Sequence, residues 1–216
     1  MKDSPLLPID YWNELKARYG DKPCIYTTVE HGWAGNYFKQ YDDLEKFNKK
    51  NGTNIRWIYG AEAYWVKDRH ESDRSNCHIV LLARTDKGRK AINKILSIAN
   101  KDGYYARPRI DLELIDQLPY DDVMITTACV AFWNKYDDIA DIVRHLAESF
   151  PHFYLEVQAH NTPAQKELNR HIIQISEELL VPIIAGCDSH VITESQMLDR
   201  DELLKSGNIH YEDEDG

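Results

Sequence analysis

Residues 181–190 read VPIIAGCDSH, an apolar run that ends in an Asp-x-His pair. The run predicts a buried strand with Asp188 and His190 at its C-terminal end. Residues two apart in an extended segment point to the same side, so the carboxylate and the imidazole can reach one metal ion as oxygen and nitrogen donors. The alternative is a polar turn in which Asp188 caps a loop and His190 is exposed, since Asp and Ser are common turn residues.

Other predicted strands also carry residues of metal-binding types at or near one end. A carboxylate inside an apolar stretch needs a partner. Taken singly, a histidine beside an apolar run is a satisfied core or surface residue, and a buried cysteine behaves as a small hydrophobe. If the strands run parallel around a common axis, however, these groups converge on one mouth of a barrel, where barrel active sites lie. The residues are His31, Glu62, His78 and Cys129.

Predicted helices alternate with the predicted strands. Apolar residues recur every three or four positions in the helical segments, and the last of these begins with Thr162 and Pro163, a cap followed by a residue that a first helical turn accepts. This order predicts an α/β barrel or a layered parallel sheet. The strands are expected at 24–32, 55–66, 77–83, 122–129, 153–160 and 181–190, and the helices at 37–50, 87–100, 137–149 and 163–180.

Length and composition fit one domain. The 216 residues are 43% hydrophobic, enough for a single core, and the net charge of -10 argues against a surface made for broad phosphate-backbone binding. The four cysteines show no disulfide pattern, which favours a reducing compartment. The sequence shows neither a leader nor an apolar run of membrane-spanning length. We therefore expect a cytoplasmic protein without membrane association.

The motifs, taken in order, resemble a known family. They are TVEHG (28–32), GAEAY (60–64), HIVLLAR (78–84), GYYARPRID (103–111), TAC (127–129), FYLEVQAH (153–160) and CDSH (187–190). Together they resemble the PHP (polymerase and histidinol phosphatase) domain, in the form found at the N-terminus of bacterial and phage DNA polymerase III alpha subunits. The segments 104–111 and 154–160 point to the polymerase branch.

The resemblance covers nearly the whole chain and implies a fold. It implies a PHP-type distorted TIM-like (β/α)7 barrel over residues 1–195, and an acidic segment over 196–216 that leads toward polymerase regions absent here. The family's early His-x-His has no match, which implies that the first barrel strand lies upstream and that the domain is truncated. Glu30 stands where the family motif has Asp.

The resemblance also implies a site for up to three divalent ions, with fewer expected here. Zn, Mn and Fe suit a mixture of imidazole, carboxylate and thiolate ligands better than Mg does. Asp3 is matched to the early Asp of the family site. The other matched ligand positions are His31, Glu62, His78, Cys129, Asp188 and His190.

The implied activity is that of a metal-dependent phosphoesterase or 3′ to 5′ exonuclease in DNA replication. Its partners would be a DNA 3′ end or another phosphoester, the remaining polymerase regions and replisome subunits. The polymerase site itself lies outside this sequence. Two alternatives stay open: an inactive structural PHP module or fragment that supports a polymerase, and a free-standing phosphoesterase similar to histidinol phosphatase.

Further polar and aromatic residues have two interpretations each. Arg107 and Arg109 can bind a substrate phosphate bidentately, or they pack and form salt bridges with Asp111 or Glu113. His160 is expected at the rim of the site. For the tryptophans, packing in the core or at the rim is favoured over base stacking; they are Trp33, Trp57, Trp65 and Trp133.

Overall fold

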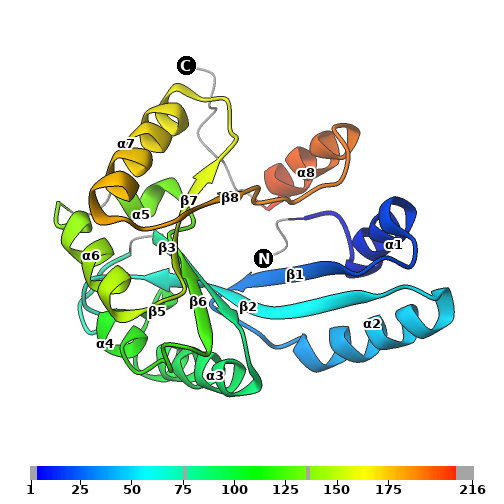
Figure 1. Ribbon diagram of the computed structural model, residues 1–216, viewed down its shortest axis with the longest axis horizontal. Coiled ribbons are helices and arrows are strands. Elements are labelled where there is room, and N and C mark those ends of the chain that lie inside the picture. The colour runs from blue at the N-terminus through cyan, green and yellow to red at the C-terminus, as the bar shows by residue number, and fades with distance from the viewer. Residues whose placement is uncertain (1–3, 75–76, 135–136, 208–216) are drawn as a thin grey trace. The chain divides into compact units, whose positions relative to one another are not determined.

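The computed structural model describes residues 4–74, 77–134 and 137–207, apart from the side chain of residue 134 (Figure 1). The chain divides into two compact units. The smaller unit takes its described residues from Met1–Tyr26, Asn36–Trp57 and Cys187–Gly216, and the larger unit comprises Thr27–Gly35 and Ile58–Gly186. Strands β1 (Cys24–His31) and β2 (Ile55–Trp65) have residues in both units.

The smaller unit contains the helices α1 (Pro8–Tyr19), α2 (Tyr37–Asn51) and α8 (Ser195–Ser206). Pro8 occupies the first turn of α1, where its missing N–H costs nothing. The core of this unit is aromatic and aliphatic, and the ring of Trp12 meets that of Tyr26 edge-on at 6.0 Å. The core residues are Trp12, Tyr26, Leu44, Phe47 and Ile55.

The larger unit contains most of the sheet and the helices that cover it (Figure 1). Helices α3 (Asp86–Lys101), α6 (Ile139–Ser149) and α7 (Pro163–Leu179) pack against β3 (Cys77–Ala83), β5 (Arg107–Ile110) and β7 (Phe153–Gln158). Its further strands are β3 (Cys77–Ala83), β4 (Tyr104–Tyr105), β5 (Arg107–Ile110), β6 (Val123–Thr126), β7 (Phe153–Gln158) and β8 (Ile183–Gly186). Its helices are α3 (Asp86–Lys101), α4 (Leu112–Ile115), α5 (Val130–Asn134), α6 (Ile139–Ser149) and α7 (Pro163–Leu179).

The sheet is mixed and curls into a half-barrel. Its strand order is β4-β5-β2-β3-β6-β7-β8, and β1 pairs with β2. The pairs β2/β5, β6/β7 and β7/β8 are parallel, whereas β2/β3, β3/β6 and β4/β5 are antiparallel. The prediction of parallel strands is therefore wrong for β2/β3 and β3/β6, whereas β4 and β5 lie in a segment where no strand was predicted. In the β2/β3 pair, residues 66–74 contribute no helix to the connection, and a parallel pair needs a long crossover.

The two faces of this sheet carry different side chains. The face toward the helices is apolar and fully buried, as at Ile79, Leu81, Ile125 and Leu155. Successive side chains alternate between faces, and the register pairs Glu62 with Val80 and Val80 with Thr126. On the opposite face, the polar residues Glu62 of β2 and Thr126 of β6 therefore flank the apolar Val80 of β3.

The four predicted helices are confirmed by α2, α3, α6 and α7 within one or two residues at each end. Thr85 caps α3 by accepting a hydrogen bond from the N–H of Gly88, and Thr162 caps α7 in the same way from Gln165. None of the helices in the described ranges combines the length and apolar character that crossing a bilayer requires.

Candidate metal centre

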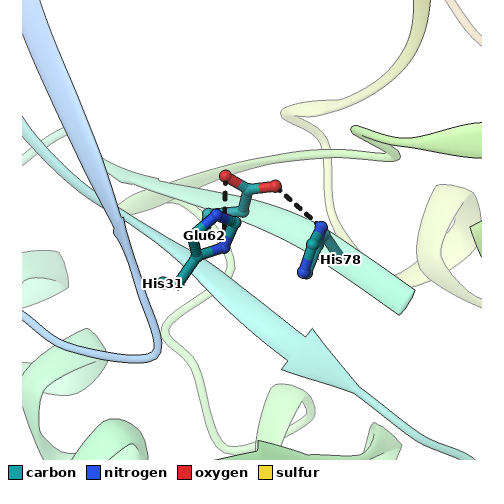
Figure 2. Close-up of side chains that lie close together, drawn as sticks. All are labelled: His31, Glu62 and His78. Atoms are coloured by element: carbon teal, nitrogen blue, oxygen red, sulfur yellow. Dashed lines mark ion pairs between the residues drawn. The ribbon is translucent and has the colours of Figure 1, made fainter. Parts of the chain in front are cut away.

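Three side chains from three neighbouring strands meet in the larger unit (Figure 2). His31 is the last residue of β1, Glu62 lies within β2, and His78 is the second residue of β3. One ligand atom from each lies within 4.8 Å of the other two. Nδ1 of His78 is 3.0 Å from Oε1 of Glu62, and Nδ1 of His31 is 3.5 Å from Oε2. The carboxylate therefore interacts with both imidazoles.

The backbone explains why these side chains meet. In the antiparallel register of β2 and β3, Tyr64 pairs with His78 and Glu62 pairs with Val80. Glu62 is therefore the diagonal neighbour of His78, within reach of a long side chain. The N–H of Gly32 donates to the carbonyl of Glu62 at 2.8 Å, which fixes the end of β1 beside β2.

Gly32 is required where β1 ends. Its φ is +61°, in the left-handed region that favours glycine. A Cβ at this position would lie 2.7 Å from Cγ of Pro108 and 3.3 Å from Cδ2 of Tyr64. The turn after His31 therefore packs closely on both residues, and this close packing limits the positions that His31 can take.

Aromatic packing holds the two imidazoles in place. The ring centroids of His31 and His78 are 4.7 Å apart. The ring of Tyr64 stacks on His31 at 5.6 Å and lies 5.0 Å from His78. Side chains fixed by packing need little reordering when they bind a ligand.

Opposing effects act on the charge of His78. Burial disfavours the imidazolium, but the neighbouring Cys129 and Glu62 outweigh it and raise the pKa of His78 to about 9. For Cys129, burial favours the neutral thiol, but the interaction with His78 prevails and the pKa of the thiol is lowered. Cys129 therefore lies close to His78. The strand predicted over 122–129 is shorter than expected, because β6 ends at Thr126, so Cys129 reaches His78 from the segment after the strand.

These residues could hold a metal ion. Two imidazole nitrogens and a carboxylate oxygen are a donor set that divalent transition metals accept. Nε2 of His78 is buried and makes no hydrogen bond to an oxygen or nitrogen atom within the described part of the chain, although the imidazole interacts with the thiol of Cys129. A buried polar atom in that state calls for a specific explanation, and metal ligation provides one. Metal binding would displace the proton of the charged imidazole.

Comparison with known proteins decides the family. A family model described as the PHP domain matches residues 25–160, a range that includes His31, Glu62, His78 and Cys129. The chain belongs to the PHP domain family. The predicted α/β fold of the PHP type is confirmed by this match and by the curled mixed sheet.

Relatives of this PHP domain are DNA polymerase III alpha subunits. The chain is 32% identical to the subunit of Aquifex aeolicus over 88% of its own length and 19% of the relative. It is 28% identical to that of Borreliella burgdorferi, over 83% of the chain and 16% of the relative. It is 25% identical to the subunit of Deinococcus radiodurans, over 89% of the chain and 15% of the relative. The chain therefore spans less than a fifth of the length of these relatives.

Asp188 and His190 lie in the smaller unit, outside the residues that the family model matches. β8 ends at Gly186, and Asp188 has a left-handed backbone with φ +43°, so the two do not meet by strand alternation as expected. They still form a pair, with Oδ1 of Asp188 3.2 Å from Nε2 of His190. Ser4 donates to the carbonyl of His190 at 2.5 Å. Their role as ligands stays a prediction, and Asp3 and the acidic residues 208–216 lie outside the described residues.

Arg107 is linked by Tyr64 to the group of His31, Glu62 and His78. Its guanidinium donates to the Tyr64 hydroxyl at 2.7 Å and stands over the ring, 4.8 Å from the centroid. Tyr64 is the same residue that packs on His31 and His78. Arg107 is half-buried, and its predicted role in phosphate binding stays a prediction.

Arg109 has different surroundings, although only Pro108 separates it from Arg107. It is buried, and its guanidinium donates to four backbone carbonyls, of Arg69, Glu71, Asp73 and Gly103, at 2.5 to 3.0 Å. These bonds favour the packing alternative for Arg109 over substrate binding. They also fasten the loop that follows β2.

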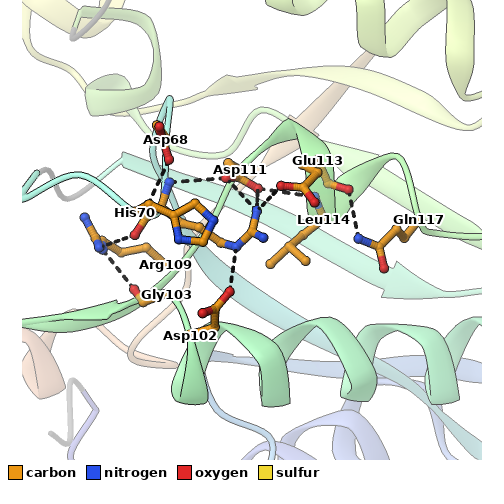
Figure 3. Close-up of polar contacts among 10 residues, drawn as sticks. Asp68, His70, Asp102, Gly103, Arg109, Asp111, Glu113, Leu114 and Gln117 are labelled. Atoms are coloured by element: carbon orange, nitrogen blue, oxygen red, sulfur yellow. Dashed lines mark hydrogen bonds and ion pairs between the residues drawn. The ribbon is translucent and has the colours of Figure 1, made fainter.

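Asp111 and Glu113, the acidic residues expected to pair with Arg107 or Arg109, bind Arg69 instead. Figure 3 shows Asp102, Asp111 and Glu113 with their polar contacts. The Arg69 guanidinium donates to both carboxylate oxygens of Asp111, at 2.8 and 2.9 Å, and to Glu113 at 2.7 Å. Asp102 lies 3.5 Å away. We call these residues, with Arg109, the Arg69 network. Sequence analysis missed Arg69 because a single arginine in a polar loop carries no pattern.

A second polar cluster lies on the same face of the sheet as Glu62 and His78. Glu156 accepts hydrogen bonds from Thr126 at 2.7 Å and from Gln158 at 3.1 Å. His160 follows the end of β7 and is exposed, and its predicted place at the rim stays a prediction. Sequence analysis also missed Tyr64, which could have been found from its alternation with Glu62 along β2.

Proposed function

We propose that this PHP domain is a metal-dependent phosphoesterase module that acts on DNA as a 3′ to 5′ exonuclease. The observation that carries the proposal is the group of His31, Glu62 and His78, whose ligand atoms lie within 4.8 Å of one another. Zn, Mn or Fe suits this donor set better than Mg. The names of the relatives support DNA as the substrate.

In the proposed mechanism each residue has a distinct role. His31, Glu62 and His78 would hold the ion, and Cys129, which interacts with His78, would be a further ligand. A bound divalent ion lowers the pKa of a coordinated water and neutralises charge that develops on a phosphoester. Arg107 binds a non-bridging phosphate oxygen, and Tyr64 positions Arg107 by its hydroxyl and its ring. Asp188 and His190 are proposed as metal ligands of the smaller unit.

The proposed partners follow from the relatives. Since the chain spans less than a fifth of their length, the remaining regions of a polymerase and replisome subunits are the expected partners. A DNA 3′ end is the expected substrate. The net charge of -10 favours contact at a confined site over a long phosphate-binding surface.

The proposal is tested by incubating the chain with Mn²⁺ or Zn²⁺ and a 5′-labelled single-stranded oligonucleotide. We expect shortening from the 3′ end that EDTA abolishes. Glu62→Gln should abolish it as well, because the amide removes the negative charge between the two imidazoles. His145→Ala is the matched control, since His145 is an exposed histidine that pairs with Asp116 at 2.8 Å.

The other outcomes separate the alternatives. Metal binding without cleavage of the oligonucleotide would contradict the exonuclease and favour the inactive structural module. Cleavage of small phosphomonoesters but not of DNA would favour the free-standing phosphoesterase. Equal cleavage by Glu62→Gln and the unaltered chain would contradict the assigned site.

A further inference from the structure

Trp33 is an exposed aromatic residue two positions after His31. It lies in the larger unit, in the segment that connects β1 to α2, and 60% of its surface is exposed. Packing in the core or at the rim was predicted for Trp33, Trp57, Trp65 and Trp133. Trp65 and Trp133 are buried, so Trp33 differs from them. Packing in a core does not explain this residue.

The indole of Trp33 is seated on a glycine. A Cβ at Gly35 would lie 2.2 Å from Nε1, 2.4 Å from Cε2 and 2.5 Å from Cζ2 of the ring. These distances are far below van der Waals contact, so the ring occupies the space that any side chain at position 35 would need. One part of the indole thus rests on backbone while most of its surface stays open, which is an arrangement suited to stacking.

The turn that carries Trp33 is tied to the metal group and to Arg107. The residue before Trp33 is Gly32, which donates to the carbonyl of Glu62 at 2.8 Å and packs against Pro108. The residue before Pro108 is Arg107, whose guanidinium donates a hydrogen bond to the hydroxyl of Tyr64 at 2.7 Å. Consecutive Cα atoms are about 3.8 Å apart. The backbone of Trp33 therefore lies within a few residue lengths of both the predicted metal ligands and the predicted phosphate-binding arginine.

We propose that Trp33 stacks on the base of a nucleotide whose phosphate binds at the metal group and Arg107. The inference rests on the nucleotide substrate of the proposed function and makes Trp33 the residue that favours a terminal nucleotide with a base over one without a base. Base stacking on an aromatic ring needs no positive charge, which suits a chain with a net charge of -10. Stacking tolerates every base, because each base has a π face.

The test measures binding with hydrolysis blocked. Fluorescence anisotropy is recorded with the full chain, Mn²⁺ and a short 5′-fluorescein oligothymidylate whose 3′-terminal linkage is a phosphorothioate. A second probe is identical except that its 3′-terminal residue lacks the base. Trp33→Ala should weaken binding of the first probe about tenfold and leave binding of the second unchanged.

Three further variants isolate the ring. Trp33→Phe keeps an aromatic ring and should recover most of the lost affinity for the base-bearing probe. Gly35→Ala keeps the indole but displaces it, and should weaken binding of that probe alone; φ of Gly35 is not positive, so alanine adds no backbone strain. Tyr120→Ala is the matched control, because Tyr120 is also 60% exposed in the larger unit and should change neither affinity.

The outcomes separate this inference from the proposed function. Equal weakening of both probes by Trp33→Ala, or no weakening of either, would overturn the stacking role. Failure of the unaltered chain to prefer the base-bearing probe would overturn it too. If the preference depends on Trp33 but an unmodified oligonucleotide is not cleaved, the exonuclease proposal fails and the stacking role stands.

Discussion

The larger unit contains two clusters of charged side chains that differ in the chemistry of their members. In the Arg69 network, the buried Arg69 and Arg109 donate to carboxylates and backbone carbonyls and hold a loop. The group of His31, Glu62 and His78 brings two imidazoles and a carboxylate together, and these are groups that bind metal ions. Each cluster has a buried nitrogen without a hydrogen bond to an oxygen or nitrogen atom among the described residues, Nε of Arg69 in one and Nε2 of His78 in the other. Charge and unpartnered atoms therefore do not separate a structural cluster from a functional one, but the ligand chemistry of the side chains does.

The largest expected effect on stability comes from breaking the Arg69 network. Asp111→Ala removes the bidentate partner of Arg69 and the cap that accepts from the N–H of Leu114 at 3.2 Å. Loss of one partner from a buried ion pair costs about 3 kcal/mol or more in the free energy of unfolding. Urea unfolding of the variant and of the unaltered chain measures this loss of free energy.

The control for Asp111 is Glu113→Ala, which removes an exposed partner of the same guanidinium. Its effect on unfolding should be clearly smaller, because water replaces an exposed carboxylate. Equal losses for the two variants would contradict the view that burial makes this network structural.

The next largest effect separates the two arginines on either side of Pro108. Lysine cannot reproduce the planar fork of arginine, so Arg109→Lys leaves buried carbonyls unpaired and should cost about 2 kcal/mol in the free energy of unfolding. Arg107→Lys should change that free energy by less than about 0.5 kcal/mol, while it weakens binding of an oligonucleotide. Equal destabilisation by both substitutions would show that Arg107 is structural as well.

A smaller effect is expected at the Glu156 cluster. A Cβ at Gly186 would lie 1.8 Å from Oε1 of Glu156, so Gly186→Ala must displace the carboxylate that accepts from Thr126. We expect a loss of about 1–2 kcal/mol in the free energy of unfolding. In a Glu156→Ala background the same substitution should cost much less, as a double-mutant cycle would show. If the losses in the free energy of unfolding from Gly186→Ala and Glu156→Ala simply add, the alanine at position 186 does not act through the Glu156 carboxylate.

Much of the fold could be predicted because its elements carry local patterns. α3 and α7 have regular apolar spacing and Thr caps, and both are found where the sequence places them. α1 was missed, although Pro8 and Trp12 gave a weak signal. The antiparallel pairing of β3 with β2 and β6 was missed for a different reason: alternation along a strand gives its faces but not its direction.

The site could be predicted only in part. Strand ends pointed to His31, Glu62 and His78, and the structure brings these three together. Strand alternation was the wrong reason for pairing Asp188 with His190, because a left-handed residue at 188 makes that contact through a turn. Arg107 and Arg109 carry the same side chain in the same short segment, so only their burial and partners distinguish them.

The most direct test of the account is the metal content of the purified, dialysed chain by mass spectrometry. The account predicts about one Zn, Mn or Fe ion per chain, kept in His145→Ala and lost in His78→Ala, with circular dichroism showing that both variants are folded. An unaltered chain without metal, or a His78→Ala variant that keeps the same metal content, would contradict the assignment of His31, Glu62 and His78 as a metal centre.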